Sequence, residues 1–338
     1  MGGVGERVRA GDSAAPSRER SGAGQRGYPR GPRPRRVERD RARWQHALAM
    51  SDPPATPGAA RWLPPDTFRG RVAVVTGGGT GLGLELSRAL AALGATVVIA
   101  SRSSEHQQAF LREAAERGWS ADAVVLDVRE PALVREAERA IRDRHGAVNL
   151  LVNNAAGNFV CPSERLSANA WRSVLGIVLD GTFYCSQAFG RTMLESESGG
   201  VILNVLATYA WTGMPGVVHS ASAKAGVLAM TKTLAAEWAG RGVRVNAIAP
   251  GPFESDGARE NLWPSAEAKQ RIEEAIPLRR FARADEVAAQ GLWLLSPAAE
   301  YVTGECLVVD GGAVLGRGMW QEGERFRRKR AAEPGAPS

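Results

Sequence analysis

The run HSASAK at 219–224 places a hydroxyl and a cation four residues apart, on Ser220 and Lys224. On a helix this spacing puts both groups on one face. The hydroxyl of Ser220 is a far weaker acid than a phenol, whose reference pKa is ~10. A cation beside such a hydroxyl favours anionic charge nearby.

A glycine-rich turn, TGGGTGLG at 76–83, follows a short apolar run and precedes leucines at helical spacing. Glycine permits a sharp turn and lets the backbone approach a pyrophosphate, while the following helix offers unpaired N–H groups to the anion. A glycine cluster alone could be a plain tight turn, but its place between a strand and a helix favours dinucleotide binding. We expect cofactor contacts from Gly77, Gly79, Thr80, Gly81, Leu82 and Gly83.

Strand and helix patterns alternate along most of the chain. Apolar runs predict seven strands, at 72–75, 96–100, 123–126, 150–152, 201–205, 243–248 and 307–309. This order predicts an α/β fold, a single Rossmann-type doubly wound domain with a seven-stranded parallel sheet flanked by helices. The carboxyl ends of parallel strands share one edge, where such folds bind dinucleotides.

The end of the second predicted strand distinguishes NAD from NADPH. An acidic residue there would hold the ribose 2′-hydroxyl of NAD, but this chain has Ser101 and Arg102. A guanidinium beside hydroxyls suits a 2′-phosphate, so we predict NADPH, although Arg102 could also be a solvated loop residue. Further cofactor contacts are expected at the ends of other strands, from Asp127, Val128, Asn154, Ala155, Pro250, Gly251, Pro252 and Phe253.

These motifs resemble those of short-chain dehydrogenases/reductases, in which the residue four before the lysine is normally a tyrosine; here it is Ser220. The stretches at 153–159, 164–167, 220–238 and 250–253 resemble 2,4-dienoyl-CoA reductase, nearest in pattern to the mitochondrial form and farther from the peroxisomal form. The resemblance implies NADPH-dependent reduction of a 2,4-dienoyl-CoA to a 3-enoyl-CoA in unsaturated fatty-acid β-oxidation, usually by a homotetramer. The expected substrate is therefore an acyl-CoA thioester.

The resemblance also implies roles for single residues. It makes Tyr209 the catalytic phenol and Asn158 a second donor to the thioester carbonyl. Ser220 would add a hydroxyl near the same oxygen, and Lys224 would hold the nicotinamide ribose. In such a reaction hydride adds to the far end of a conjugated diene and charge moves to the thioester oxygen, where donors stabilise the dienolate. Without the resemblance, Tyr209 could be a loop aromatic and Asn158 a turn residue.

Acyl-CoA contacts are implied as well, although Ser167 first suggests a helix N-cap. The family arginine that would touch the acyl-CoA is replaced by Asn261, and Arg259 lies two residues earlier as a substitute. Val178 stands where other short-chain reductases carry an asparagine of a proton relay; this fits a mechanism without that relay and also a degenerate site. The residues implied to bind substrate are Arg102, Arg129, Phe159, Ser167 and Arg259.

Three functions are consistent with this pattern. The leading hypothesis is an NADPH-dependent dienoyl-CoA reductase. The second is a short-chain reductase of another activated alkene or a ketone, with Tyr209 as its acid. The third is a catalytically weak NADP-binding sensor or scaffold, in which Ser220 marks the loss of activity.

The net charge of +7 arises at the amino-terminal end, where 12 arginines and five acidic residues lie within residues 1–49. Residues 1–60 are rich in Arg, Gly, Pro and Ser, which predicts a disordered leader. This leader could be a transit peptide, a nucleic-acid-binding arm or an overlong reading frame before Met50, and we favour the last. We expect the reductase domain at 61–316 and a basic tail at 317–338.

The rest of the composition limits the partners. No apolar run approaches the ~18 residues needed to span a bilayer, so no membrane partner is expected. The charges after residue 49 balance, so no nucleic-acid partner is expected either. Cys161, Cys185 and Cys306 fit neither a metal site nor a disulfide framework, which favours a reducing compartment. We expect a cytoplasmic location in a bacterial cell ahead of a mitochondrial one. Small and apolar residues on predicted helices suggest a homotetramer.

Overall fold

A parallel sheet of seven strands forms the centre of the computed structural model, which describes residues 58–254 and 265–315. Its strands lie in the order β3-β2-β1-β4-β5-β6-β7, all parallel. The prediction of a seven-stranded parallel sheet is confirmed. Along the chain the strands are β1 Val72–Thr76, β2 Thr96–Ser101, β3 Ala121–Val125, β4 Val148–Asn153, β5 Gly200–Val205, β6 Val243–Pro250 and β7 Cys306–Val309.

Burial explains why the apolar runs form the middle of this sheet. Every residue of β1 and β4 is buried, as expected for parallel strands covered on both faces. β3 lies at an edge and is only partly buried. Its predicted position, 123–126, was therefore off by two residues at the start and one at the end, because its polar beginning lacks the apolar signal of the central strands.

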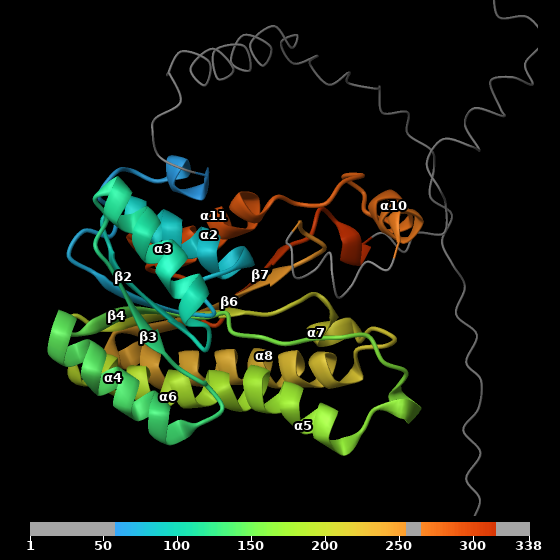
Figure 1. Cartoon of the computed structure of the whole chain (residues 1–338), viewed down its shortest axis with the longest axis horizontal. Helices are drawn as coiled ribbons and strands as arrows, with labels where there is room; N and C mark the ends of the chain where they lie inside the picture. The colour runs from blue at the N-terminus through green and yellow to red at the C-terminus, as the bar shows by residue number, and fades with distance from the viewer. Residues whose placement is uncertain (1–57, 255–264, 316–338) are drawn as a thin grey trace, which may run out of the picture. The chain divides into compact units, whose positions relative to one another are not determined.

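Helices cover both faces of the sheet (Figure 1). α2, α3 and α11 lie on one side, and α4, α5, α6 and α8 lie on the other. Six short turns, five of 3-10 type and one π-helical turn (η3), complete the described elements: η1 Gly58–Trp62, η2 Ser163–Arg165, η3 Gly176–Asp180, η4 Ala239–Arg241, η5 Pro297–Ala299 and η6 Ala313–Leu315. The helices are α2 Gly81–Ala92, α3 Ser104–Arg117, α4 Pro131–His145, α5 Ala168–Leu175, α6 Gly181–Glu195, α7 Tyr209–Thr212, α8 Val218–Trp238, α10 Ala266–Ala275 and α11 Ala284–Leu295.

Of three apolar clusters among the described residues, the two largest hold helices against the two faces of the sheet. On one face, Leu86 and Leu90 of α2 and Leu292 of α11 pack on β1, β2 and β5. On the other face, Phe189 of α6 and Ile141 of α4 pack on the opposite sides of the same strands. The alternation of side chains along each strand thus supplies both cores.

The ordered domain begins earlier than predicted. Gly58–Trp62 form η1, in which Ala59 and Ala60 are fully buried against α2 and α11. Residues 58–60, assigned to the leader from composition, therefore belong to the packed domain, because two alanines fit the gap between these helices. The rest of the predicted leader and tail lies outside the described residues.

The order of the strands locates the site. Strands β1 to β3 are added toward one edge of the sheet and β4 to β7 toward the other, so the strand order switches between β1 and β4 and leaves a crevice at their carboxyl ends. The glycine turn and the loops after β2, β4 and β5 all leave the sheet at this edge. Among the helices that the structure describes, none has the length and apolar character that crossing a membrane requires.

Candidate active site

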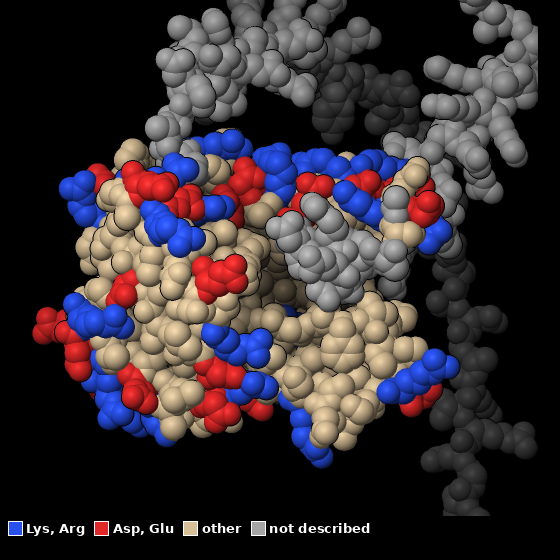
Figure 2. All heavy atoms as spheres, in the orientation of Figure 1, with Lys and Arg blue, Asp and Glu red and all other residues tan. Residues whose placement is uncertain are grey.

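A cavity of about 340 Å³ lies at the carboxyl ends of β1, β2 and β4. We call it the nucleotide cavity, after its predicted ligand. Figure 2 shows the surface hollowed near this edge of the sheet, with acidic and basic side chains beside the hollow. Eight of the predicted cofactor residues at the ends of the first four strands line this cavity, whereas Gly79, Gly81, Leu82 and Gly83 do not. The cavity is lined by Gly77, Thr80, Ala100, Ser101, Arg102, Ser103, His106, Leu126, Asp127, Val128, Asn154, Ala155, Ala156 and Ile177.

The glycine turn fits a pyrophosphate because its surface is backbone. Gly77 has a φ of 64°, and a Cβ there would lie 3.0 Å from Asn154 Nδ2 and 3.2 Å from Ala155 Cα. Asn154 fixes the turn by donating to the carbonyls of Thr76, at 3.0 Å, and Gly77, at 3.2 Å. Thr80 precedes α2 without making a side-chain cap, so the first-turn N–H groups remain for an anion.

Thr76 is a structural residue of this turn whose role was not predicted from the sequence. Its hydroxyl donates to the Val152 carbonyl at 3.2 Å and accepts from the backbone N–H groups of Asn154 and Ala155, each at 3.0 Å. The threonine therefore joins the ends of β1 and β4 across the crevice. The sequence signal for this role was the position of the threonine, between a predicted buried strand and a run of glycines.

The end of β2 presents polar groups to the same cavity. Arg102 is exposed, and Ser101 and Ser103 are half-buried beside it. Gln107 of α3 donates to the carbonyls of Ser101, at 2.9 Å, and Val124, at 2.8 Å, which holds the ends of β2 and β3 together. A guanidinium and two hydroxyls at a fixed strand end suit the dianionic 2′-phosphate of NADPH.

Arg129, predicted to bind the acyl-CoA, pairs with Asp127. Its Nε lies 3.0 and 3.1 Å from the two carboxylate oxygens of Asp127, and its Nη2 lies 2.5 Å from the second. These bonds hold the pKa of Asp127 below its usual range and raise the pKa of Arg129. The structure thus places Arg129 at the rim of the nucleotide cavity, with its guanidinium already engaged by a carboxylate.

Three polar groups converge beyond the nucleotide cavity, and they come from three segments. Tyr209 begins α7, Ser220 lies in the first turn of α8, and Asn158 lies in the loop after β4. The hydroxyl of Tyr209 lies 3.0 Å from Ser220 Oγ and accepts from Asn158 Nδ2 at 3.4 Å. The predicted grouping of these side chains is present, since α7 packs directly against α8.

The amide of Asn158 is oriented by its neighbour. The backbone N–H of Phe159 donates to Asn158 Oδ1 at 2.9 Å. Because the amide oxygen is occupied by this bond, the amide nitrogen is the atom that faces Tyr209. Asn158 therefore acts at this site as a hydrogen-bond donor.

Burial keeps the phenol protonated. It raises the pKa of Tyr209, and the hydrogen bond with Ser220 opposes only part of that rise. At neutral pH the hydroxyl is therefore a neutral donor. A protonated phenol and an amide that share one corner can stabilise negative charge on a single oxygen atom.

Lys224 lies one turn beyond Ser220 in α8 and is buried. Its ammonium donates to the Val205 carbonyl, the last of β5. Burial lowers the pKa of Lys224 to about 8. The lysine is thus held at the carboxyl edge of the sheet, where the predicted contact with the nicotinamide ribose would occur.

Val178 lies within η3, the π-helical turn that joins α5 to α6. It is buried, and its carbonyl accepts from the Thr182 hydroxyl at 2.7 Å. An apolar side chain carries no proton, and the local carbonyl is already occupied by that hydroxyl. The position therefore does not support the proton relay that an asparagine would serve.

The remaining predicted residues lie apart from this corner. Ser167 is the N-cap of α5, accepting from the Ala170 N–H at 3.2 Å, so the N-cap prediction is confirmed. Gly251 follows β6 and donates its N–H to the Val309 carbonyl at 3.0 Å. Phe253 packs against the core on the α11 side of the sheet. Arg259 and Asn261 lie outside the described residues.

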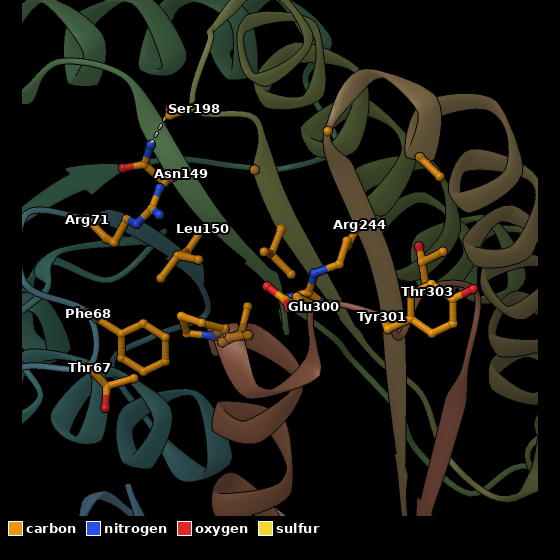
Figure 3. A pocket seen from close by; sticks show the side chains of 16 residues that line it. Thr67, Phe68, Arg71, Asn149, Leu150, Ser198, Arg244, Glu300, Tyr301 and Thr303 are labelled. Atoms are coloured by element: carbon orange, nitrogen blue, oxygen red, sulfur yellow. Dashed lines mark hydrogen bonds between the residues drawn. The ribbon is translucent and has the colours of Figure 1, made fainter. Parts of the chain in front are cut away.

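A second cavity, of about 650 Å³, lies at the opposite edge of the sheet (Figure 3). Asn149 accepts there from the Val72 N–H at 3.1 Å and donates to Ser198 Oγ at 3.1 Å. Arg244 donates to the carbonyls of three residues that surround the start of β6: Leu294 (3.0 Å), Ser296 (3.2 Å) and Val302 (3.1 Å). These groups hold the amino ends of the strands, away from the edge at which this fold binds ligands.

Comparison with known proteins agrees with this geometry. The profile of the family described as "Enoyl-(Acyl carrier protein) reductase" matches residues 77–314, from the glycine turn to the end of the sheet. The chain belongs to the short-chain dehydrogenase/reductase family. It is an oxidoreductase by that membership, and the match covers every strand from β2 to β7.

Two curated relatives are similar over most of this reductase. A "Probable 2,4-dienoyl-CoA reductase", (2E)-enoyl-CoA-producing, from Bacillus subtilis is 42% identical over 72% of the chain and 97% of the relative. A "Peroxisomal 2,4-dienoyl-CoA reductase", (3E)-enoyl-CoA-producing, from Pongo abelii is 41% identical over 74% of the chain and 86% of the relative. The resemblance to 2,4-dienoyl-CoA reductases that the motifs indicated is thereby confirmed.

A solved structure extends the comparison to the cofactor. A crystal structure of a gluconate 5-dehydrogenase from Burkholderia cenocepacia, in complex with NADP and tartrate, is 35% identical. The match covers 74% of this chain and 98% of the dehydrogenase chain, with a TM-score of 0.70. The fold described here is thus that of a nicotinamide-dependent reductase.

Proposed function

We propose that this reductase uses NADPH to reduce a 2,4-dienoyl-CoA thioester to a 3-enoyl-CoA. The observation that carries the proposal is the convergence of Tyr209, Ser220 and Asn158 beside the nucleotide cavity. These donors suit an oxygen that gains negative charge without being protonated. The names of the two curated relatives support the same reaction class.

NADPH, when bound, would supply the hydride for the δ-carbon of the diene. Negative charge then moves through the conjugated system to the thioester oxygen. Tyr209 and Asn158 donate hydrogen bonds to that oxygen, and Ser220 holds the phenol in place. Because Ser220 is buried and Tyr209 and Asn158 are half-buried, these bonds stabilise charge more than they would in water. Lys224 orients the nicotinamide ribose from the next turn of α8.

The preference for NADPH rests on the end of β2. Arg102, Ser101 and Ser103 line the cavity where the 2′-substituent of the adenosine ribose would lie. No acidic residue takes the place of Arg102 at this strand end, so the ribose 2′-hydroxyl of NAD has no carboxylate to bind. The NADP in the gluconate 5-dehydrogenase structure supports this assignment.

The position of the product double bond depends on which carbon takes the proton. Protonation of the dienolate at the α-carbon gives a 3-enoyl-CoA, and protonation at the γ-carbon gives a 2-enoyl-CoA. We propose the 3-enoyl product, with the proton delivered by water, because Tyr209 and Asn158 are assigned to the oxygen. Reaction in D₂O followed by NMR separates the two: deuterium at the α-carbon supports this product, and deuterium at the γ-carbon refutes it.

Steady-state turnover of the full chain tests the reaction. With NADPH, 2,4-hexadienoyl-CoA should be reduced at least tenfold faster than 2-hexenoyl-CoA or a simple ketone, since only the diene forms the extended dienolate. Turnover of ketones without turnover of the dienoyl thioester would assign the protein to another short-chain reduction. Tight NADPH binding without turnover of any of them would favour a sensor or scaffold.

We further propose that the enzyme acts as a homotetramer in unsaturated fatty-acid β-oxidation and works in a bacterial cytoplasm. Phe183 of α6 remains exposed in this chain although it belongs to a helix that is otherwise well packed, which fits a subunit contact. The described cysteines are all free, and Cys185 is buried, which fits a reducing compartment.

A further inference from the structure

His219 is a buried polar residue that the proposed mechanism does not use. It precedes Ser220 in α8 and has no exposed surface, at 0%. Neither ring nitrogen makes a hydrogen bond of good geometry within the described residues, and the polar group that interacts with the ring is the backbone of Phe159. One weak polar contact offsets little of the desolvation cost of a buried imidazole, so its position requires a further explanation.

The explanation offered by the structure is a ring contact. The imidazole of His219 stacks on the ring of Phe159, with the centroids 4.5 Å apart and the planes 29° from parallel. Such stacking is favourable and fixes the orientation of both rings. It joins α8 to the loop after β4, two segments that are distant in the sequence.

Phe159 in turn controls its neighbour, Asn158. The Phe159 N–H holds Asn158 Oδ1 at 2.9 Å, and this bond turns the amide nitrogen toward Tyr209. The contact from Asn158 Nδ2 to the phenol is 3.4 Å, near the upper limit for a hydrogen bond. A small displacement of the 158–159 segment would therefore remove it.

We infer that His219 is a positioning residue: its ring holds Phe159 in place, and Phe159 aims the Asn158 amide at the oxygen-binding corner. The first turn of α8 then positions both hydrogen-bond donors, Tyr209 and Asn158. Ser220 contacts Tyr209 directly, and His219 acts on Asn158 through the stack. The effect on rate rests on the proposed function, whereas the geometric effect does not.

A direct catalytic role does not fit the enclosure of His219. With no exposed surface, the ring has no access to a substrate in the crevice. Burial also lowers the pKa of the imidazole, so the ring is neutral and retains a flat aromatic face at neutral pH. The stack needs that face rather than a charge.

The test compares His219→Leu, which removes the stack, with His219→Phe, which restores an aromatic ring. In His219→Leu we expect kcat with 2,4-hexadienoyl-CoA to fall roughly tenfold or more while the Kd for NADPH changes less than about twofold. His219→Phe should stay within about threefold of the wild type, since it retains the ring. Phe159→Leu removes the same stack from the other side and should match His219→Leu.

Crystal structures of the variants supply a readout independent of turnover. In His219→Leu, Asn158 Nδ2 should lie beyond 3.5 Å from Tyr209 Oη, and in His219→Phe it should stay within that limit. Leu234→Ala, another buried position of α8, controls for general loss of stability and should leave kcat unchanged. If the amide keeps its place in both leucine variants, or if His219→Phe loses as much activity as His219→Leu, the inference is wrong. A wild type inactive on dienoyl thioesters would refute the proposed function alone.

Discussion

A phenol reaches the position expected of the family tyrosine from a different element. The residue four before Lys224 is a serine, yet the hydroxyl of Tyr209, from α7, lies 3.0 Å from that serine's oxygen. A phenol therefore lies beside the serine, although it is carried by α7 rather than by α8. The amide nitrogen of Asn158 lies 3.4 Å from the same hydroxyl, so two hydrogen-bond donors meet there.

We expect Lys224 to make the binding of NADPH depend on pH. Burial lowers its pKa to about 8, so the ammonium present at pH 7 is lost as the pH rises through that value. NADPH is an anion, so its affinity should weaken about threefold to tenfold between pH 7.5 and 9.5. Fluorescence titration of NADPH at several pH values measures this.

The Lys224→Met variant provides the comparison. It should bind NADPH more weakly at every pH, with a flat dependence over the same interval. The thiols of Cys185 and Cys306 do not titrate in this interval, because burial raises the pKa of Cys185 to about 12 and that of Cys306 to about 11. A wild-type affinity that is constant to pH 9.5 would remove Lys224 from cofactor binding.

Arg102 should set the preference between the two nicotinamide cofactors. Replacing Arg102 with alanine removes the cation at the end of β2, so the KM for NADPH should rise about tenfold or more while that for NADH changes little. Arg117→Ala, which removes a guanidinium that pairs with Glu113 at the far end of α3, is the matched control. An equal rise in the KM for NADPH and for NADH would mean that Arg102 does not bind the 2′-phosphate.

At the scale of elements, a network of buried hydrogen bonds between side chains holds β4, β5, α6 and α8 together behind the site. Asn153 Nδ2 donates to Ser186 Oγ at 3.0 Å and to Asn204 Oδ1 at 2.9 Å. Asn204 Nδ2 donates to Thr231 Oγ1 at 2.9 Å. These bonds fix α8 against the sheet, and so they fix Ser220 and Lys224 with it.

The Asn204→Ala variant should therefore be markedly destabilised. It removes two buried hydrogen bonds and leaves Asn153 with one partner fewer, which should lower the free energy of unfolding by about 2–4 kcal/mol. Urea denaturation followed by circular dichroism measures the change. Thr233→Ala, an exposed position of α8, should change it by less than about 0.5 kcal/mol. A loss below 1 kcal/mol in Asn204→Ala would show that this network of buried hydrogen bonds is not needed for stability.

At the scale of the whole molecule, the sequence predicted the sheet because buried parallel strands are nearly continuous apolar runs. β3 was misplaced because Asp122 interrupts its start, and this carboxylate is tolerated at an edge, where Arg144 and His145 pair with it. The nucleotide cavity was predictable because its residues follow directly from strand ends.

The meeting of three polar side chains near α7 was not predictable from their spacing in the sequence. Tyr209, Ser220 and Asn158 come from three segments, and only the family resemblance grouped them before the structure did. No periodicity relates His219 to Phe159, so their stack required the three-dimensional arrangement of α8 and the β4 loop. Long-range side-chain contacts of this kind carry no local sequence signal.

The assembly is a second question at this scale. A homotetramer should form through α6 and its neighbours, where Phe183 is exposed and lies against Tyr184 in an edge-on contact. Light scattering of the full chain should give four times the chain mass of 35.9 kDa. Phe183→Asp should shift the population toward smaller species, because it places a charge in an apolar contact. A wild type that remains monomeric at micromolar concentration would contradict this assembly.

The most direct test of the account is the rate of hydride transfer in a single turnover with Tyr209→Phe. With NADPH bound first and 2,4-hexadienoyl-CoA added, the account predicts a rate about 10²–10³ lower than that of the wild type, with the NADPH Kd nearly unchanged. Transfer at the wild-type rate would show that Tyr209 does not stabilise the charge that develops on the thioester oxygen, and it would contradict the proposed mechanism.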